Sequence, residues 1–348
     1  MPNWTPVAVA VGVGAGCGVA LWLWQRSRRC PPDQWVEVGS VGQLLIYPVK
    51  STRGVDCPAF DCTIWGPQVG EMADRQFLLV SPDTNEMVTG RAAPRTVLIC
   101  ADVQQDVLTL RPFHDAQSLL GRVGVDLADV RAQAADRERP AIMWSGLETR
   151  GLDCGDEAAR WLSTFLYDDA SPPRVRLLYF QQGLRNERGV NASNVDGNFG
   201  RAATERDQLV AYPDFAPYMV TTEPSLRDLN SRFERGRYSS RRFRPNIVVK
   251  SDTLEPFAED RWLRLKIGAA EFTAVKWCGR CLFTTVDPES GIRSEDKEPF
   301  KTLKSYRQVT GARNAEYNSE PIFGTNVVLD KAADIKVGDA VYAVYGKP

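Results

Sequence analysis

The chain has 348 residues, enough for two modest domains or one large one, and we expect two because single hydrophobic cores stop growing at roughly 250 to 300 residues. With 43% hydrophobic and 25% charged residues, the composition is that of an ordinary globular protein. The 43 basic and 44 acidic side chains nearly cancel, which argues against a nucleic-acid polymer as partner, and any anion-binding role must rest on local clusters of Arg and Lys.

The N-terminus carries the first strong signal. The run from Val7 to Trp24 contains no charged residue and ends at an Arg-rich cluster, residues 25–29. A helix of that length rises about 1.5 Å per residue and nearly crosses a bilayer core of about 30 Å. Because the positive charges follow the apolar run, a cleaved secretory signal is disfavoured and the positive-inside rule places the rest of the chain in the cytosol. We expect residues 1–35 to form a retained single-pass membrane anchor and linker.

The first folded region is predicted to be mainly β. Short apolar runs alternate with turn residues, and the predicted strands cover residues 44–47, 77–80, 96–100 and 107–110. A helix follows, with Asp153 as its cap. Its apolar positions have the spacing of a core-facing stripe, and they are Ala158, Trp161, Leu162, Phe165 and Leu166. This helix closes the first predicted domain, residues 36–182.

The second predicted domain, residues 183–348, follows a polar stretch, 181–207, that is typical of a long functional loop. Thr222 is predicted to cap a helix that carries Leu226, Leu229 and Phe233. Strand-like runs then return at residues 246–249, 262–267, 272–275, 282–286 and 327–329, and a turn and closing strand cover 335–342. The pattern predicts an α+β fold that is mainly β, with a β-barrel-like second lobe.

Few residue types that carry common chemistry are available. His114 is the only histidine, which disfavours Cys/His zinc sites, haem with a His ligand and Ser–His or Cys–His nucleophile pairs. We expect His114 to lie in an exposed turn. Of the eight cysteines, only Cys278 and Cys281 have a spacing that suggests chemistry, and most of the others are predicted to be plain buried thiols.

The segment Cys278-Gly279-Arg280-Cys281 leaves four interpretations open: a redox dithiol, half of a tetrathiolate zinc site, a ligand for a soft high-valent metal, or inert thiols. Zinc would need a second such pair, which the chain lacks. A thioredoxin-like dithiol would open a helix rather than lie among strands. Pattern alone favours inert thiols. Arg280 shifts the balance toward metal ligation, because a guanidinium beside a thiol favours the thiolate.

Basic residues recur where a barrel would gather its loops. Singly, each is more typical of a solvated surface charge. As a set they suit a phosphorylated cofactor, because Arg grips phosphate bidentately and Lys neutralises it. The set comprises Lys50, Arg75, Arg91, Arg95, Arg244, Lys304 and Arg307.

These motifs form one ordered set along the chain. It comprises Tyr47–Ser51, Asp74–Arg75, Met87–Arg91, Phe243–Asn246, Arg280–Pro288, Lys304–Arg307 and Lys336–Asp339. In order and spacing the set resembles the MOSC-domain proteins, and more narrowly the mitochondrial amidoxime-reducing components, over nearly all of the chain from about Val41. The resemblance implies a MOSC N-terminal β-barrel-like lobe followed by a MOSC β-barrel domain. It also implies that the transmembrane helix anchors the protein in the outer mitochondrial membrane, with the body facing the cytosol.

The resemblance further implies a molybdenum cofactor, with the metal held by a molybdopterin dithiolene and by the thiolate of Cys281. Soft sulfur ligands suit this metal. Asp214 is implied to lie near the metal as a candidate proton relay. The residues implied to hold the pterin and its phosphate are Lys50, Ser51, Arg75, Asp214, Arg244, Asn246, Asn326 and the backbone of Gly279 and Arg280. The chain departs from the family pattern at Phe215 and Ala216, where hydroxyls are expected, and at Asn326, where an aromatic residue is expected.

The implied activity is the reduction of small N-hydroxylated compounds, namely amidoximes, hydroxylamines and N-hydroxylated base analogues, as a detoxification reaction. No flavin or haem motif is visible, so electrons must arrive from outside, and the family precedent is NADH-cytochrome b5 reductase with cytochrome b5. A molybdenum cofactor carrier or sulfur-transfer MOSC protein is the alternative, although the pyridoxal-phosphate domain of the sulfurases does not fit in 348 residues. A membrane-tethered interaction protein would need neither Cys281 nor the basic set.

Overall fold

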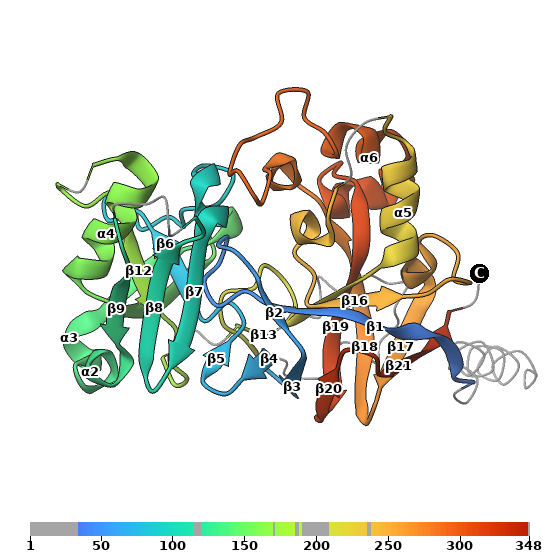
Figure 1. Ribbon diagram of the computed structural model, residues 1–348, viewed down its shortest axis with the longest axis horizontal. Helices are drawn as coiled ribbons and strands as arrows, with labels where there is room; N and C mark the ends of the chain where they lie inside the picture. Colours follow the sequence, from blue (N-terminus) through green and yellow to red (C-terminus); the bar gives the residue numbers. More distant parts are fainter. Residues whose placement is uncertain are drawn as a thin grey trace, which may run out of the picture. The chain divides into compact units, whose positions relative to one another are not determined.

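The computed structural model describes residues 34–114, 120–169, 171–184, 188–189, 209–234 and 238–346 (Figure 1). The predicted membrane anchor, Val7 to Trp24, lies outside these residues, as does much of the polar stretch 181–207. None of the helices in the described ranges is long and apolar enough to cross a membrane.

The largest sheet closes into a barrel. Its strands follow one another in the order β16, β15, β19, β18, β17, β21 and β1, and an additional pairing of β16 with β1 closes the ring, while β2 extends from β1. The bounds are β1 Val36–Ile46, β2 Val55–Cys57, β15 Tyr218–Thr222, β16 Ile247–Lys250, β17 Trp262–Ile267, β18 Ala270–Gly279, β19 Ile322–Lys331 and β21 Ala340–Tyr345. This confirms the predicted mainly β fold with a barrel in its second half.

One strand of the barrel comes from the opposite end of the described chain. In β1, Val41 pairs with Val249 and Leu44 with Ile247 of β16, and Figure 1 shows the two strands side by side. The last residues of β1 are fully buried in the core. The turn that follows β1 therefore begins at the barrel, although its residues belong to the first predicted domain. The boundary at residues 182 and 183 stays a prediction.

The strands between β2 and β15 form smaller sheets. A four-stranded sheet has the order β10-β11-β12-β6, a three-stranded sheet β7-β8-β9, and a second four-stranded sheet β20-β3-β4-β5, while β13 pairs with β14. The bounds are β3 Ala59–Thr63, β4 Gly66–Val69, β5 Met72–Ala73, β6 Phe77–Val80, β7 Ile99–Gln104, β8 Val107–Pro112, β9 Val123–Asp126, β10 Glu138–Ile142, β11 Glu148–Asp153, β12 Arg176–Tyr179, β13 Arg188–Gly189, β14 Leu209–Val210 and β20 Asp334–Lys336.

The α-helices are few and short. They are α2 Leu127–Ala132, α3 Ala134–Arg137, α4 Asp156–Tyr167, α5 Glu223–Ser231 and α6 Phe300–Arg307 in the described part of the chain. The predicted stripe of α4 is buried, as expected. Its predicted cap is wrong, because Gly155 occupies the N-cap position and the Asp153 carboxylate pairs with Arg176 at 2.5 Å. The cap of α5 is confirmed, since the Thr222 hydroxyl accepts from the backbone N–H of Ser225 at 3.2 Å.

Two predicted strands are wrong. Residues 96–100 fall mostly in a 3-10 helix, η1 (Pro94–Leu98), and residues 282–286 in another, η9 (Leu282–Thr285). Pro94 fixes φ and lacks an N–H, which favours a helical first turn over a strand ladder. In η9 the Thr285 hydroxyl donates to the carbonyl of Leu282 at 2.7 Å, a local bond that competes with strand pairing. The remaining predicted strands are found, and His114 lies in an exposed turn as expected.

Candidate cofactor site

A cavity of about 300 Å³ brings together every residue that the resemblance assigned to the cofactor site. The volume is that of a small-molecule site. The lining segments are far apart in sequence and include the turn after β1, the link into β16 and the end of β18. The predicted residues among the lining are Lys50, Ser51, Arg75, Asp214, Arg244, Asn246, Gly279, Arg280, Cys281 and Asn326. The cofactor contact of each residue stays a prediction.

Three lining residues hold the backbone in the left-handed region. φ is 71° at Ser51, 49° at Arg75 and 55° at Arg244. A residue with a Cβ adopts this conformation at a cost of about 1 kcal/mol or more, and such positions persist where the surrounding structure imposes them, often at binding sites. The backbone N–H of Arg75 donates to the carbonyl of Tyr47 at 2.7 Å, which holds this turn. The backbone conformation therefore supports a binding role for this wall.

A buried carboxylate organises the network beneath Arg75. Asp74 is 2% exposed, accepts from the backbone N–H of Tyr47 at 2.8 Å and from the Asn246 amide at 3.0 Å, and pairs with Arg75. A buried carboxylate requires such partners. The Asn246 amide oxygen accepts in turn from the backbone N–H of Met219 at 3.2 Å. The protein itself therefore orients Arg75 and Asn246, and Asp74 is a positioning residue that sequence reasoning quoted in a motif but did not place in the site.

Lys50 and Asp214 form an ion pair in the cavity wall. The Lys50 ammonium, in a residue that is 6% exposed, donates to Asp214 Oδ1 at 2.5 Å and to the Tyr212 carbonyl at 2.8 Å. The indole N–H of Trp144 donates to the same carboxylate oxygen. Desolvation favours the neutral acid, but Lys50, Trp144 and Arg75 outweigh it and lower the pKa of Asp214 to about 2. At neutral pH Asp214 is ionised, so it can accept a proton or orient a donor, but it holds no proton to give.

Arg244 has a buried donor without a partner. Its Nη1 donates to the Thr52 carbonyl at 2.7 Å, and its guanidinium lies 4.1 Å from the centre of the Tyr47 ring. Its Nη2 is buried and meets no acceptor among the residues described. Burial lowers the pKa of Arg244 to about 10, so the group stays charged at neutral pH. An unpaired buried donor on a charged group is costly, and a phosphate oxygen is a suitable acceptor.

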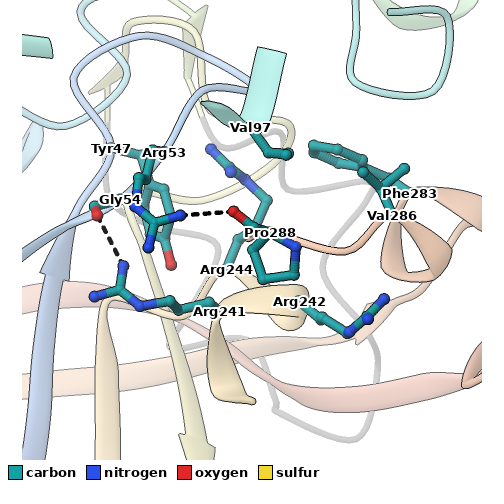
Figure 2. A pocket seen from close by; sticks show the side chains of 10 residues that line it. All are labelled: Tyr47, Arg53, Gly54, Val97, Arg241, Arg242, Arg244, Phe283, Val286 and Pro288. Atoms are coloured by element: carbon teal, nitrogen blue, oxygen red, sulfur yellow. Dashed lines mark hydrogen bonds between the residues drawn. The ribbon is translucent and has the colours of Figure 1, made fainter. Parts of the chain in front are cut away.

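A smaller pocket of about 20 Å³ adjoins the cavity and shares Arg242, Arg244 and Phe283 with it. Figure 2 shows two further arginines of this pocket turned toward backbone carbonyls. Arg53 donates to Pro288 at 2.6 Å and Arg241 to Gly54 at 2.8 Å. Both guanidinium groups are thus held by the protein, in contrast to Nη2 of Arg244.

Cys281 stands just before η9 and is half-buried in the cavity wall. Burial raises the pKa of its thiol, while the Phe283 backbone and the Arg91 guanidinium oppose the shift. The thiol is therefore protonated at neutral pH in the metal-free protein and would lose its proton on binding a metal. Cys278 lines the same cavity. The assignment of Cys281 rather than Cys278 as ligand rests on the resemblance.

The side chain of Arg280 is bonded to backbone carbonyls. Its guanidinium donates to the carbonyl of Phe323 at 2.7 and 2.9 Å and to that of Phe243 at 2.8 Å, and its backbone N–H donates to Pro321 at 2.7 Å. These bonds hold the β18 end against β19. The guanidinium of Arg280 is thus bonded to backbone carbonyls, whereas that of Arg91 opposes the rise in the pKa of the Cys281 thiol, and the influence of Arg280 on this thiol stays a prediction.

The residues that depart from the family pattern also line the cavity. Phe215 and Ala216 are in the wall, and the Lys276 ammonium lies 5.4 Å from the centre of the Phe215 ring. Asn326, on β19, is 8% exposed and donates to the Trp277 carbonyl at 3.4 Å. An aromatic ring with a nearby cation thus stands where a hydroxyl is expected.

The predicted basic set divides in space. Arg91 lines the cavity, but Arg95 pairs with Asp168 and Arg307 with Asp260, and neither they nor Lys304 are in its wall. Sequence reasoning missed several lining residues, among them Trp144, Arg242, Lys276 and Glu320. Arg242 adjoins the Phe243–Asn246 motif, which is a usable signal, whereas no local pattern singles out Trp144.

Comparison with known proteins agrees with the resemblance. Residues 38–169 match the MOSC N-terminal beta barrel domain and residues 207–342 match the MOSC domain. The human mitochondrial amidoxime-reducing component 1 is 39% identical over 306 residues, which are 88% of this chain and 83% of that protein. The mitochondrial amidoxime reducing component 2 of Bos taurus is 38% identical over 306 residues, with the same shares of 88% and 83%. The mitochondrial amidoxime-reducing component 1 of Danio rerio is 37% identical over 312 residues, 90% of this chain and 87% of that protein. The chain therefore belongs to the mitochondrial amidoxime-reducing components, a family with paired MOSC N-terminal and MOSC domains.

Proposed function

We propose that this chain is a molybdenum-cofactor-dependent reductase of N-hydroxylated nitrogen centres. One observation carries the proposal: Cys281 and the buried, unpaired Nη2 of Arg244 line one cavity, in a chain whose relatives are named amidoxime-reducing components. The substrate class consists of amidoximes, hydroxylamines and N-hydroxylated base analogues.

The side chains of the cavity suit a phosphorylated, sulfur-bearing cofactor. Cationic residues among the lining outnumber acidic ones by seven to three, which favours an anion. The cations are Lys50, Arg75, Arg91, Arg242, Arg244, Lys276 and Arg280, and the acids are Asp214, Glu316 and Glu320. In the proposed complex Cys281 ligates molybdenum and the cofactor cradle, defined as Lys50, Ser51, Arg75, Arg244 and Asn246, holds the pterin and its phosphate.

When bound, the cofactor supplies two electrons for cleavage of the N–O bond. An amidoxime, R–C(NH2)=N–OH, takes up these two electrons and two protons and becomes the amidine R–C(NH2)=NH and water. Asp214, ionised and held by Lys50, would accept a hydrogen bond from the substrate amino group and so orient the substrate. Burial raises the pKa of Glu320, which lines the same cavity, whereas the pKa of Asp214 is lowered, so Glu320 keeps its proton to a higher pH than Asp214 does.

The electron source and location are further parts of the proposal. Electrons come from NADH through cytochrome b5 reductase and cytochrome b5, since the sequence contains no flavin or haem motif. The relatives are named mitochondrial, and the apolar run at residues 7–24 is a suitable anchor for the outer mitochondrial membrane with the body in the cytosol. Co-anchoring of the redox partners on one membrane would raise their effective concentration.

The test is reconstitution of the purified protein, loaded with cofactor, with NADH, cytochrome b5 reductase and cytochrome b5. We expect stoichiometric molybdenum by elemental analysis and conversion of benzamidoxime to benzamidine that requires every component. Molybdenum without turnover would indicate the carrier or sulfur-transfer protein instead. Absence of bound molybdenum would refute both and indicate an interaction protein.

A further inference from the structure

Trp144 reaches the cavity from outside the barrel. It lies at the tip of the hairpin between β10 and β11, in the 3-10 turn η3 (Trp144–Gly146). The backbone N–H of Met143 donates to the Leu147 carbonyl at 2.8 Å, and that of Leu147 to the Trp144 carbonyl at 3.1 Å. Gly146 closes the turn at φ 74°, which glycine adopts without strain. The β10-β11-β12-β6 sheet thus positions an indole in the cavity that Cys281 lines.

Two contacts fix the orientation of this indole. Its N–H donates to Asp214 Oδ1, the atom that also accepts from Lys50. The guanidinium carbon of Arg91 lies 4.0 Å from the centre of the Trp144 ring, which makes a stacked pair. Arg91 and Trp144 both line the cavity that Cys281, the predicted metal ligand, also lines. The Arg91–Trp144 stack is therefore part of the wall around the expected reaction centre.

We propose that the Arg91–Trp144 stack is a substrate platform that selects aromatic N-hydroxylated compounds over their alkyl analogues. Trp144 is then a specificity-determining residue, and the inference rests on the proposed reductase function. Aromatic rings gain from offset stacking on an indole and from the charge of a guanidinium above a ring face. An alkyl group has neither interaction. Aryl amidoximes and N-hydroxylated aromatic rings should therefore bind more tightly than compounds with the same N–O group on an alkyl chain.

The test compares benzamidoxime with acetamidoxime, which differ only in a phenyl or methyl group next to the same N–O bond. The two readouts are the ratio of kcat/KM values and, by titration calorimetry on the cofactor-loaded protein, the ratio of Kd values. We expect Trp144→Leu to reduce the preference for benzamidoxime about tenfold, which corresponds to about 1.4 kcal/mol, mainly through KM. Trp144→Phe, which keeps a ring and loses the bond to Asp214, should retain most of the preference.

A matched control is Trp65→Leu. Trp65 packs on Phe180 at 5.4 Å between ring centres and is not among the residues that line the cavity, so its loss should leave the ratio unchanged. Arg91→Lys keeps the charge and removes the guanidinium plane, and it should lower the ratio in the same direction as Trp144→Leu. This variant tests the platform if Trp144→Leu does not fold.

The outcomes separate the platform from the reductase. Losses that are equal for both substrates in Trp144→Leu and Arg91→Lys would leave the ratio unchanged and would overturn the platform, as would the absence of any loss. If wild-type protein reduced neither amidoxime yet bound benzamidoxime more tightly in a Trp144-dependent way, the reductase function would be refuted and the platform supported. Binding without any dependence on Trp144 would refute the platform, whatever the turnover.

Discussion

Replacement of Arg244 by alanine should lower cofactor occupancy while leaving the cofactor-free fold nearly unchanged. The variant loses the bond to the Thr52 carbonyl, worth about 1 kcal/mol, and the stacking on Tyr47, worth about 1 kcal/mol. It also removes the unpaired buried Nη2, whose desolvation costs about 1 to 3 kcal/mol. These contributions nearly cancel. We therefore expect the melting temperature of the cofactor-free protein to shift by no more than a few degrees.

The cofactor-bound state should be affected far more. A hydrogen bond between Arg244 and phosphate is charge-assisted, and its loss costs about 1.5 to 3 kcal/mol, or roughly ten- to a hundred-fold in affinity. The assay is molybdenum content after reconstitution at a series of limiting cofactor concentrations, with thermal unfolding of the cofactor-free protein in parallel. Turnover per bound molybdenum should change much less than occupancy.

Arg53→Ala is the matched control for this experiment. Arg53 is also stacked on a ring, 3.3 Å from the centre of Phe113, and bonded to a carbonyl, that of Pro288, but it is not in the wall of the larger cavity. Its loss should leave cofactor affinity unchanged. Full occupancy of Arg244→Ala at limiting cofactor would remove Arg244 from the cradle. If both variants lost cofactor affinity equally, the loss would be due to the removal of a positive charge and not to a specific contact of Arg244.

Three further predictions follow from the sequence and the site. Cys281→Ala should abolish molybdenum-dependent turnover and Cys278→Ala should retain most of it, and the reverse result in the same assay would exchange the two roles. Burial and the nearby Asp260 raise the pKa of Glu259 from 4.5 to about 7, so the folded state binds this proton more tightly and stability falls as the pH rises from about 4.5 to about 7. Glu259→Gln should remove that fall in stability. The assignment would be contradicted if the melting temperature of the variant fell between these pH values as much as that of the wild type. Deletion of residues 1–35 should yield a soluble protein that still reduces benzamidoxime with excess cytochrome b5 and its reductase but no longer localises to mitochondria, as judged by activity and by cell fractionation.

Local signals in the sequence predicted the parts of the fold that local interactions decide. The N-cap of α5 depends only on Thr222 and on Ser225, three residues later in the chain. The buried stripe of α4 depends only on the spacing of its apolar residues, so both features were predictable. The strand predicted at residues 96–100 was wrong because apolar content in a short run does not distinguish a strand from a 3-10 turn begun by Pro94. The place of β1 in the barrel depends on pairing with β16, a long-range contact that no local pattern specifies.

The site divides in the same way. Its predicted residues were identified through an ordered set of motifs, not through any one spacing, because they meet only after the barrel closes. The left-handed backbone at Ser51, Arg75 and Arg244 carries no sequence signal, since none of the three is glycine. Trp144 was missed because the direction of a hairpin tip depends on how its sheet packs.

Mutations should separate the role of the cofactor cradle from that of the Arg91–Trp144 platform. The cradle is held by buried networks, such as Asp74 with Arg75 and Asn246, whereas the platform stands on a hairpin tip joined to the cradle through Asp214. Changes at the tip should therefore alter substrate choice without loss of cofactor. We expect Trp144→Leu to keep its molybdenum content while losing the benzamidoxime preference, and Arg244→Ala to lose molybdenum while its remaining holoprotein keeps that preference. If both variants lost both properties together, cofactor and substrate would share one set of contacts, and the division of the cavity argued here would be wrong.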